Sequence, residues 1–162
     1  MDSSNFIKGR TVFITGASSG IGKACAERFA SLGCHLILTA RRLDRLQALA
    51  QSLSTKHGIS CHHFPLDVRS HEQIEAIFYR LAADQIEVDI LLNNAGLALS
   101  TDKLQEGKIS NWDTMIDTNL KGLLYITRAV LPSMIERNSG HIFNISSVAG
   151  HGYYPSGNVY CA

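Results

Sequence analysis

The sequence lacks long apolar runs and has no excess of charge of either sign. No run approaches the roughly 20 apolar residues that cross a bilayer, and residues 1–10 lack the apolar core of a secretion signal. We therefore expect a cytoplasmic protein that does not bind membranes. The 15 Lys+Arg residues against 14 Asp+Glu residues leave a net charge of +1. This balance argues against nucleic acid as a partner, because binding to a polyanion requires a basic surface.

Cysteine pairs and metal-ligand patterns are also missing. The four cysteines are scattered and form no Cys-x-x-Cys pair, so we expect packing residues rather than disulfides or a thiol redox site. The seven histidines show no recognised ligand spacing, and solvated or packed histidines account for them without a metal. The cysteines are Cys25, Cys34, Cys61 and Cys161.

Short apolar runs alternate with longer stretches of helical periodicity. Hydrophobic residues make up 45% of the chain, and no linker or repeat divides it, so we expect a single domain over residues 1–162. Strands that are apolar on both faces and are separated by helices are typical of a parallel sheet covered on both sides. The sequence thus predicts a doubly wound α/β fold of the Rossmann type. The expected strands are 11–15, 36–39, 59–66, 89–93 and 141–146.

Two Ser-x-x-(polar or acidic) patterns predict where helices begin. Residues 70–73 form a capping box before the third helix. Residues 110–113 form a second such pattern, which predicts the start of a long helix that reaches about residue 137 and is interrupted at Pro132.

A glycine-rich turn follows the first expected strand. Gly16 would permit the tight turn, Gly20 would let the backbone approach a pyrophosphate, and Gly22 would allow close packing of the next helix. Free N–H groups at the start of that helix would face the anion. The alternative is an ordinary connecting loop. The turn residues that we expect to bind a nucleotide are Gly16, Ser18, Ser19, Gly20, Ile21 and Gly22.

Two arginines stand where the choice between NAD and NADP is made. About twenty residues beyond the glycines, NAD-binding proteins place an acid, whereas NADP-binding proteins place a cation near the 2′-phosphate. This chain has Arg41 and Arg42 and no carboxylate there, which favours NADP as the cofactor. Alternatively, both arginines only cap the second strand and lie in solvent.

Asp67 and Val68 end the third expected strand at the same edge of the sheet. A carboxylate at this point can accept a hydrogen bond from an adenine amino group. Alternatively, Asp67 is only the aspartate that leads into the next helix. Both readings of Asp67 stay open.

Four motifs in order resemble the short-chain dehydrogenase/reductase family. They are the glycine-rich turn from Thr15 to Gly22, the stretch 93–96 (Asn-Asn-Ala-Gly), Asn119, and Ser147 followed by Tyr160 after twelve residues. The resemblance extends from about residue 11 to residue 162. The stretches 93–99, 115–123, 127–138 and 157–160 are most similar to NADP-dependent 3-hydroxy acid dehydrogenases that oxidise serine and allo-threonine.

The resemblance implies hydride transfer between a nicotinamide and a small hydroxylated or carbonyl substrate. Tyr160 would then be the acid/base that moves a proton on the substrate oxygen, and Ser147 would hydrogen-bond that oxygen. Asn119 would help to hold a water-mediated proton relay. The residues that would contact the nicotinamide half of the cofactor are Asn94, Ala95 and Gly96, with Tyr160 beside them.

Each of these residues also has an ordinary interpretation when it is taken alone. A tyrosine in a Gly/Pro loop is usually a packing residue, and a serine after a strand usually serves the turn, which applies to Tyr160 and Ser147. Asn119 can bond a neighbouring backbone group instead of binding a ligand. We interpret Asn93 as structural.

The sequence departs from the family pattern at its end. The resemblance implies a lysine four residues after Tyr160, and the sequence stops at Ala162, so we expect a C-terminally incomplete chain. Made alone, it should expose an apolar strand edge at 141–146, be poorly soluble and lack turnover. The resemblance also implies that the full-length protein is a homo-oligomer, a dimer or tetramer that forms through the long helix and the missing helix next to it. The main alternative function is a non-catalytic NADP(H)-binding module; a scaffold protein ranks last.

Overall fold

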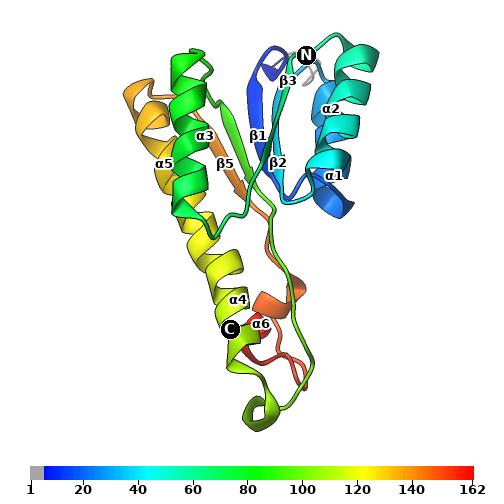
Figure 1. Cartoon of the computed structure of the whole chain (residues 1–162), viewed down its shortest axis with the longest axis vertical. Helices are drawn as coiled ribbons and strands as arrows, with labels where there is room; N and C mark the ends of the chain where they lie inside the picture. Colours follow the sequence, from blue (N-terminus) through cyan, green and yellow to red (C-terminus); the bar gives the residue numbers. More distant parts are fainter. Residues whose placement is uncertain (1–5) are drawn as a thin grey trace.

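The computed structural model describes residues 6–162 and contains a five-stranded sheet in the order β3-β2-β1-β4-β5 (Figure 1). All four neighbouring pairs of strands are parallel. This confirms the predicted doubly wound α/β sheet. Each strand lies within its predicted run or within one residue of it, and the last three strands are shorter than predicted. Their bounds are β1 Thr11–Thr15, β2 His35–Ala40, β3 Cys61–Pro65, β4 Ile90–Asn93 and β5 His141–Asn144.

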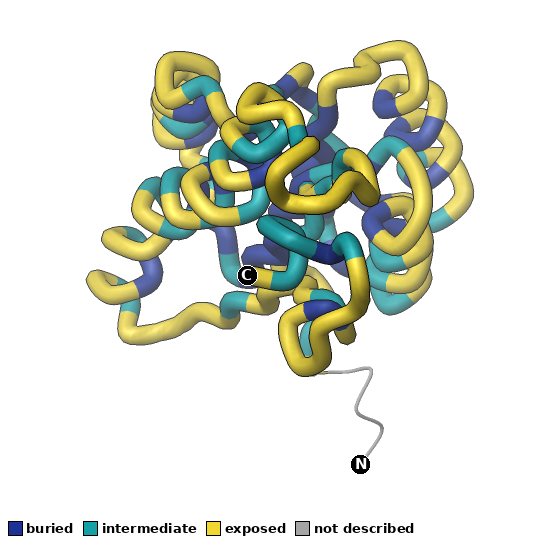
Figure 2. Tube along the Cα trace, turned by 90° about the horizontal axis from the view of Figure 1, so that it is seen from below, coloured by how far each residue is buried: buried dark blue, intermediate teal, exposed yellow. Residues whose placement is uncertain are grey.

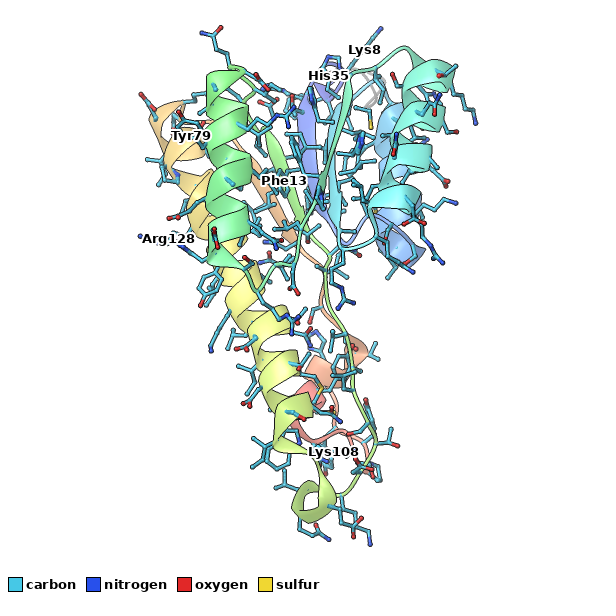
Figure 3. The ribbon with its side chains drawn as sticks, in the orientation of Figure 1. Lys8, Phe13, His35, Tyr79, Lys108 and Arg128 are labelled. Carbon is cyan, nitrogen blue, oxygen red and sulfur yellow. The ribbon has the colours of Figure 1, made fainter. Side chains whose placement is uncertain are left out.

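Alternate side chains of the strands enter two separate cores. Val12 and Ile14 of β1 pack in the core under α1 (Gly20–Ser31) and α2 (Leu43–His57). Phe13 points to the opposite face, where it stacks on Phe78 of α3 with 5.4 Å between ring centroids (Figure 3). This second core lies under α3 (His71–Ala83) and α5 (Leu123–Glu136). The sheet is therefore covered on both faces, as Figure 1 shows.

Helix α3 begins where the sequence predicts, whereas the long helix does not. Ser70 accepts a hydrogen bond from the backbone N–H of Gln73 at 3.3 Å, which is the capping interaction. The prediction that Ser110 caps the long helix is wrong: α4 (Ile109–Ile116) has Lys108 at its N-cap, with no side-chain cap. The backbone is already extended at Lys108, so Ser110 falls inside the first turn, where its hydroxyl cannot cap.

The predicted interruption of the long helix at Pro132 is also wrong. Pro132 lies inside α5, on an exposed position, and the helix continues to Glu136. The irregularity comes earlier, in the π-helical stretch η3 (Asp117–Gly122) between α4 and α5. Gly122 in this stretch packs so closely on Val68 that a Cβ atom would lie 2.6 Å from the valine Cγ2. The π turn therefore forms where the long helix touches the end of β3.

Among the described residues, strand β5 is one edge of the sheet and β3 is the other. The side chains of Phe143 and Ile145 are 44% and 40% exposed. The ring of His141 stacks on Phe143 at 4.7 Å and covers part of the edge. Among residues 6–162, no helix combines the length and the apolar character needed to span a membrane.

Candidate functional site

A cleft of about 1050 Å³ opens at the carboxyl ends of the strands. It lies at the point where the strand order reverses between β1 and β4, which is where open α/β sheets bind ligands. Helices α4 and α6 (Asn158–Cys161) lie beyond this end of the sheet (Figure 1). The cleft brings together every predicted site residue except Gly22. These residues are Gly16, Ser18, Ser19, Gly20, Ile21, Arg41, Arg42, Asp67, Val68, Asn94, Ala95, Gly96, Asn119, Ser147 and Tyr160.

The three glycines of the turn have three different physical reasons to be glycine. Gly16 has φ +68°, in the left-handed region that a tight turn requires. Gly20 has φ +56°, and a Cβ atom on it would meet nothing within 4 Å, so this side of the turn is open to a ligand. Gly22 faces inward, because a Cβ atom there would collide with the side chain of Asn94 and lie 2.6 Å from the carbonyl oxygen of Gly16. Gly22 thus shapes the turn without lining the cleft.

Thr15 locks this turn to the loop that follows β4. Its buried hydroxyl oxygen accepts hydrogen bonds from the backbone N–H groups of Asn94 and Ala95, both at 2.9 Å. The side-chain amide of Asn94 donates in return to the carbonyl oxygens of Thr15 at 2.8 Å and Gly16 at 3.2 Å. No sequence motif predicted a role for this hydroxyl. The available signal was a polar residue at the last position of an otherwise apolar strand.

The side chain of Arg42 lies over the glycine-rich turn. Its Nη2 donates to the hydroxyl oxygens of Ser18 at 2.9 Å and Ser19 at 2.8 Å. Its side chain does not cap α2, although Arg42 is the N-cap residue of that helix. Arg41, next to it, is exposed and lines the same end of the cleft. The structure thus gathers two guanidinium groups and two hydroxyls, all of which can donate to a phosphate.

Asp67 lines the cleft and also leads into α3. Arg69 holds both oxygens of its carboxylate, with Nε 2.9 Å from Oδ1 and Nη2 2.5 Å from Oδ2. The hydrogen bonds from the Arg69 side chain hold the pKa of Asp67 below its usual range, with a smaller contribution from the charge of Arg41. The side chain of Gln73 accepts from the Asp67 backbone N–H at 2.9 Å. These bonds are the ones expected for an aspartate that leads into a helix. Contact between Asp67 and an adenine stays a prediction.

Asn119 bonds the backbone of the loop after β4. Its Oδ1 accepts from the N–H of Leu97 at 2.9 Å, and its Nδ2 donates to the carbonyl oxygen of Leu97 at 2.8 Å. Both polar atoms of the Asn119 amide therefore bond the backbone. This agrees with the alternative interpretation of Asn119, in which it bonds a backbone group instead of a ligand. Its backbone belongs to η3 and lies at the cleft. The proton-relay role stays a prediction.

Ser147 and Tyr160 reach the cleft from the last part of the chain. The hydroxyl oxygen of Ser147 accepts from the N–H of Ala149 at 3.2 Å, so its own proton remains available for donation. Tyr160 lies in α6, one turn long. Both residues are half-buried, and the segment that leads to the C-terminus is mostly teal in Figure 2. Both residues line the cleft, and a shared contact with a substrate oxygen stays a prediction.

Asn93 lines the cleft and links three elements of the fold. Its Nδ2 donates to Oγ1 of Thr127 at 3.0 Å and to Oδ1 of Asn144 at 2.9 Å, so it joins β4 to α5 and β5. This agrees with the structural role expected for it. Its Oδ1 is buried and has no hydrogen-bond partner in the described part of the chain.

Burial makes two of the four cysteines poor nucleophiles. Burial raises the pKa of the Cys61 thiol to about 11, and it also raises the pKa of Cys34. A raised pKa lowers the fraction of the nucleophilic thiolate at neutral pH. All four cysteines are free, and within residues 6–162 no group of three or more His, Cys, Asp or Glu residues could hold a metal ion.

The sequence of this chain matches a known protein family. The family model described as short chain dehydrogenase matches residues 10–162, nearly the whole chain. The chain belongs to the short-chain dehydrogenase family. That this cleft is the dinucleotide-binding site of such a protein stays a prediction of the sequence motifs.

Three relatives illustrate the similarity. NADP-dependent 3-hydroxy acid dehydrogenase of Escherichia coli (strain K12) is 48% identical over 151 residues, which are 93% of this chain and 59% of that protein. Sulfoacetaldehyde reductase 2 of Chromohalobacter salexigens is 47% identical over 152 residues, covering 93% of this chain and 60% of that protein. The closed form of serine dehydrogenase complexed with NADP+ superposes with a TM-score of 0.87 at 47% identity, covering 93% and 59% of the two chains. The present chain thus spans about three fifths of the length of these relatives.

Proposed function

We propose that this short-chain dehydrogenase binds NADP(H) in the cleft and transfers hydride to or from a small hydroxy acid or a similar alcohol. The observation that carries the choice of NADP is Arg42, whose guanidinium lies on Ser18 and Ser19 beside the glycine-rich turn. Two similar proteins named above support it, one as NADP-dependent and the other through its complex with NADP+.

The residues of the cleft fit an NADP molecule at three points. The open side of Gly20 leaves room for a pyrophosphate against the N-terminus of α1, where Ser19 provides no side-chain cap. Arg41 and Arg42 would hold the 2′-phosphate. Asn94 and its neighbours would line the nicotinamide half, and the bound cofactor would supply the hydride chemistry.

The protein's own part of the reaction is proton transfer and orientation at the substrate oxygen. We assign to Tyr160 the transfer of the proton, and to Ser147 a hydrogen bond that stabilises charge on the same oxygen. A phenol titrates near 10 in water, so such a base needs a nearby positive charge at neutral pH. In the family this charge is a lysine four residues after the tyrosine, at the position that would be 164 here.

The test of NADP as the cofactor is the double replacement of Arg41 and Arg42 by alanine. Loss of charge-assisted hydrogen bonds to a 2′-phosphate should weaken NADPH binding about 10- to 100-fold and leave NADH binding nearly unchanged. Titration of the 162-residue chain by nucleotide fluorescence measures both affinities. The matched control replaces Arg28 and Arg45, two exposed arginines outside the cleft, by alanine. Equal losses for NADPH and NADH would contradict the phosphate contact.

We also propose that a second copy of the chain packs on the long helix. Apolar side chains at helical spacing along α4, η3 and α5 are exposed, and Figure 1 shows these elements as one rod that extends past the sheet. Exposed apolar side chains that share one face of a helix are typical of a protein–protein interface. The residues of this stripe are Ile116, Leu120, Leu124, Leu131 and Ile135.

The double variant Leu120→Glu and Leu124→Glu tests this interface. These side chains are 56% and 54% exposed, so the charges should not disturb the core. We expect the unmodified protein to be dimeric or larger by light scattering after size exclusion, and the variant to be monomeric, because a buried unpaired carboxylate is unfavourable. The control is Tyr79→Glu on the outer face of α3 (Figure 3), where the side chain is 81% exposed. An unmodified protein that is monomeric would contradict the proposal.

A further inference from the structure

We propose that Asn158 is a positioning residue for Tyr160: its side chain ties helix α6 to the loop after β4 and so fixes the place of the phenol in the cleft. This inference rests on the proposed function of Tyr160. It starts from the point where the chain enters α6 (Asn158–Cys161), the helix that carries Tyr160. The backbone at this entry, and the contacts of its side chains, set where the helix begins and therefore where its side chains lie.

The backbone that enters α6 has no freedom to change. Gly157 is buried, and a Cβ atom on it would collide with the sulfur of Cys161 and lie 3.1 Å from the carbonyl oxygen of Tyr154. Asn158 follows with φ +40°, in the left-handed region. Apart from glycine, asparagine and aspartate adopt this region most readily. The turn therefore requires one of these residue types at position 158.

The side chain of Asn158 adds a contact that only asparagine provides. Its Nδ2 donates to the backbone carbonyl oxygen of Asp102, 56 residues away in the sequence. Glycine would accept the φ angle without donating this bond. Aspartate would also accept the angle, but its carboxylate has no proton to donate at neutral pH. Asparagine thus satisfies the backbone and the bond together.

The loop that receives this bond is itself fixed to the long helix. Asn119 holds both backbone groups of Leu97, and the sulfur of Met115 accepts from the N–H of Leu99 at 3.4 Å. Asn119 and Met115 are four residues apart, on one side of the helix. Asn158 therefore connects α6, through an anchored loop, to the long helix that carries Asn119 and Met115. Tyr160 lies two residues after this connection.

The first test compares Asn158→Asp and Asn158→Gly with the unmodified 162-residue chain by amide hydrogen exchange. The backbone N–H of Ala162 bonds the carbonyl oxygen of Asn158, and that of Cys161 bonds Gly157. We expect both amides to exchange about 10-fold faster in either variant, because the last turn opens more often. The matched controls are Asn138→Asp and Asn138→Gly, since Asn138 also has a left-handed backbone, φ +48°, and lies outside the cleft. Unchanged exchange at α6 would overturn the proposal.

The second test asks whether Asn158 acts through Tyr160, in protein that turns substrate over. Both Asn158 variants should lower kcat about 10- to 100-fold by misplacing the phenol, while the affinity for NADPH changes little. In a Tyr160→Phe background, Asn158→Asp should cause no further loss, because the residue it positions is already inactive. Additive losses, or an equal loss of NADPH affinity, would contradict a positioning role.

These readouts separate this inference from the proposed function. If NADPH does not bind, or Tyr160→Phe keeps full turnover, the proposed function fails, whereas the exchange result still decides whether Asn158 holds α6. If NADPH binds and Tyr160 is essential but the Asn158 variants behave like the Asn138 controls, only the positioning role fails.

Discussion

Replacement of Tyr160 by phenylalanine is expected to lower kcat about 10²- to 10⁴-fold while NADPH affinity stays the same. The substitution removes one oxygen, and with it the group to which we assign proton exchange with the substrate oxygen. It keeps the ring and the half-buried position in α6. Steady-state kinetics measure the loss in turnover, and nucleotide fluorescence measures the affinity.

The matched control for this experiment is Tyr153→Phe. Tyr153 is 95% exposed and does not line the cleft, so the loss of its hydroxyl should leave kcat unchanged. If the 162-residue chain itself shows no turnover, the comparison is made after joining it to the part of the E. coli relative that it does not cover. Turnover by Tyr160→Phe at the level of the unmodified protein would refute the catalytic role.

The second large effect is expected from Gly22→Ala. The added methyl group would collide with Asn94 and lie 2.6 Å from the carbonyl oxygen of Gly16, a backbone atom that cannot move without deforming the turn. Overpacking of this kind destabilises by about 2–3 kcal/mol. Because the same turn forms the cleft, NADPH binding should be lost as well. Urea unfolding of the 162-residue chain measures the change in the free energy of unfolding.

Gly20→Ala and Gly58→Ala are the controls for Gly22→Ala. Both positions have positive φ, +56° and +65°, and open space around the new Cβ atom, so each variant should lose about 1–2 kcal/mol of stability from backbone strain alone. Gly20 lines the cleft and Gly58 ends α2, so only Gly20→Ala should also weaken NADPH binding. Equal stability of Gly22→Ala and Gly58→Ala would show that the turn can relax around the methyl group.

The fold could be predicted from the sequence to a large extent, because its pattern is local. Runs such as Val12–Ile14 and Leu36–Leu38 are apolar at every position, and such runs form strands only when both faces of a sheet are covered. The start of α4 and the continuity of α5 through Pro132 could not be predicted in the same way. The start of α4 depends on the extended backbone at Lys108. The continuity of α5 goes with the exposed position of Pro132. No short sequence pattern predicts either feature.

The candidate site was predictable as a set of residues but not as a set of bonds. All the predicted residues except Gly22 line one cleft, because the carboxyl ends of parallel strands meet at one edge of the sheet. The roles of the Thr15 hydroxyl and of the Asn158 amide were not predictable. Their partners, Asn94 and Asp102, are far away in the sequence.

The sequence by itself determined the succession of strands and helices along the chain, the spacing of the glycines and the family motifs. Each of these depends only on residues that are close together in the sequence. Only the tertiary structure decided that Arg42 turns toward Ser18 and Ser19, that Asn119 holds Leu97, and that Asp102 receives the bond from Asn158. Short-range sterics and periodicity act within a few residues along the chain. A hydrogen bond between distant residues exists only after the sheet has brought their loops together.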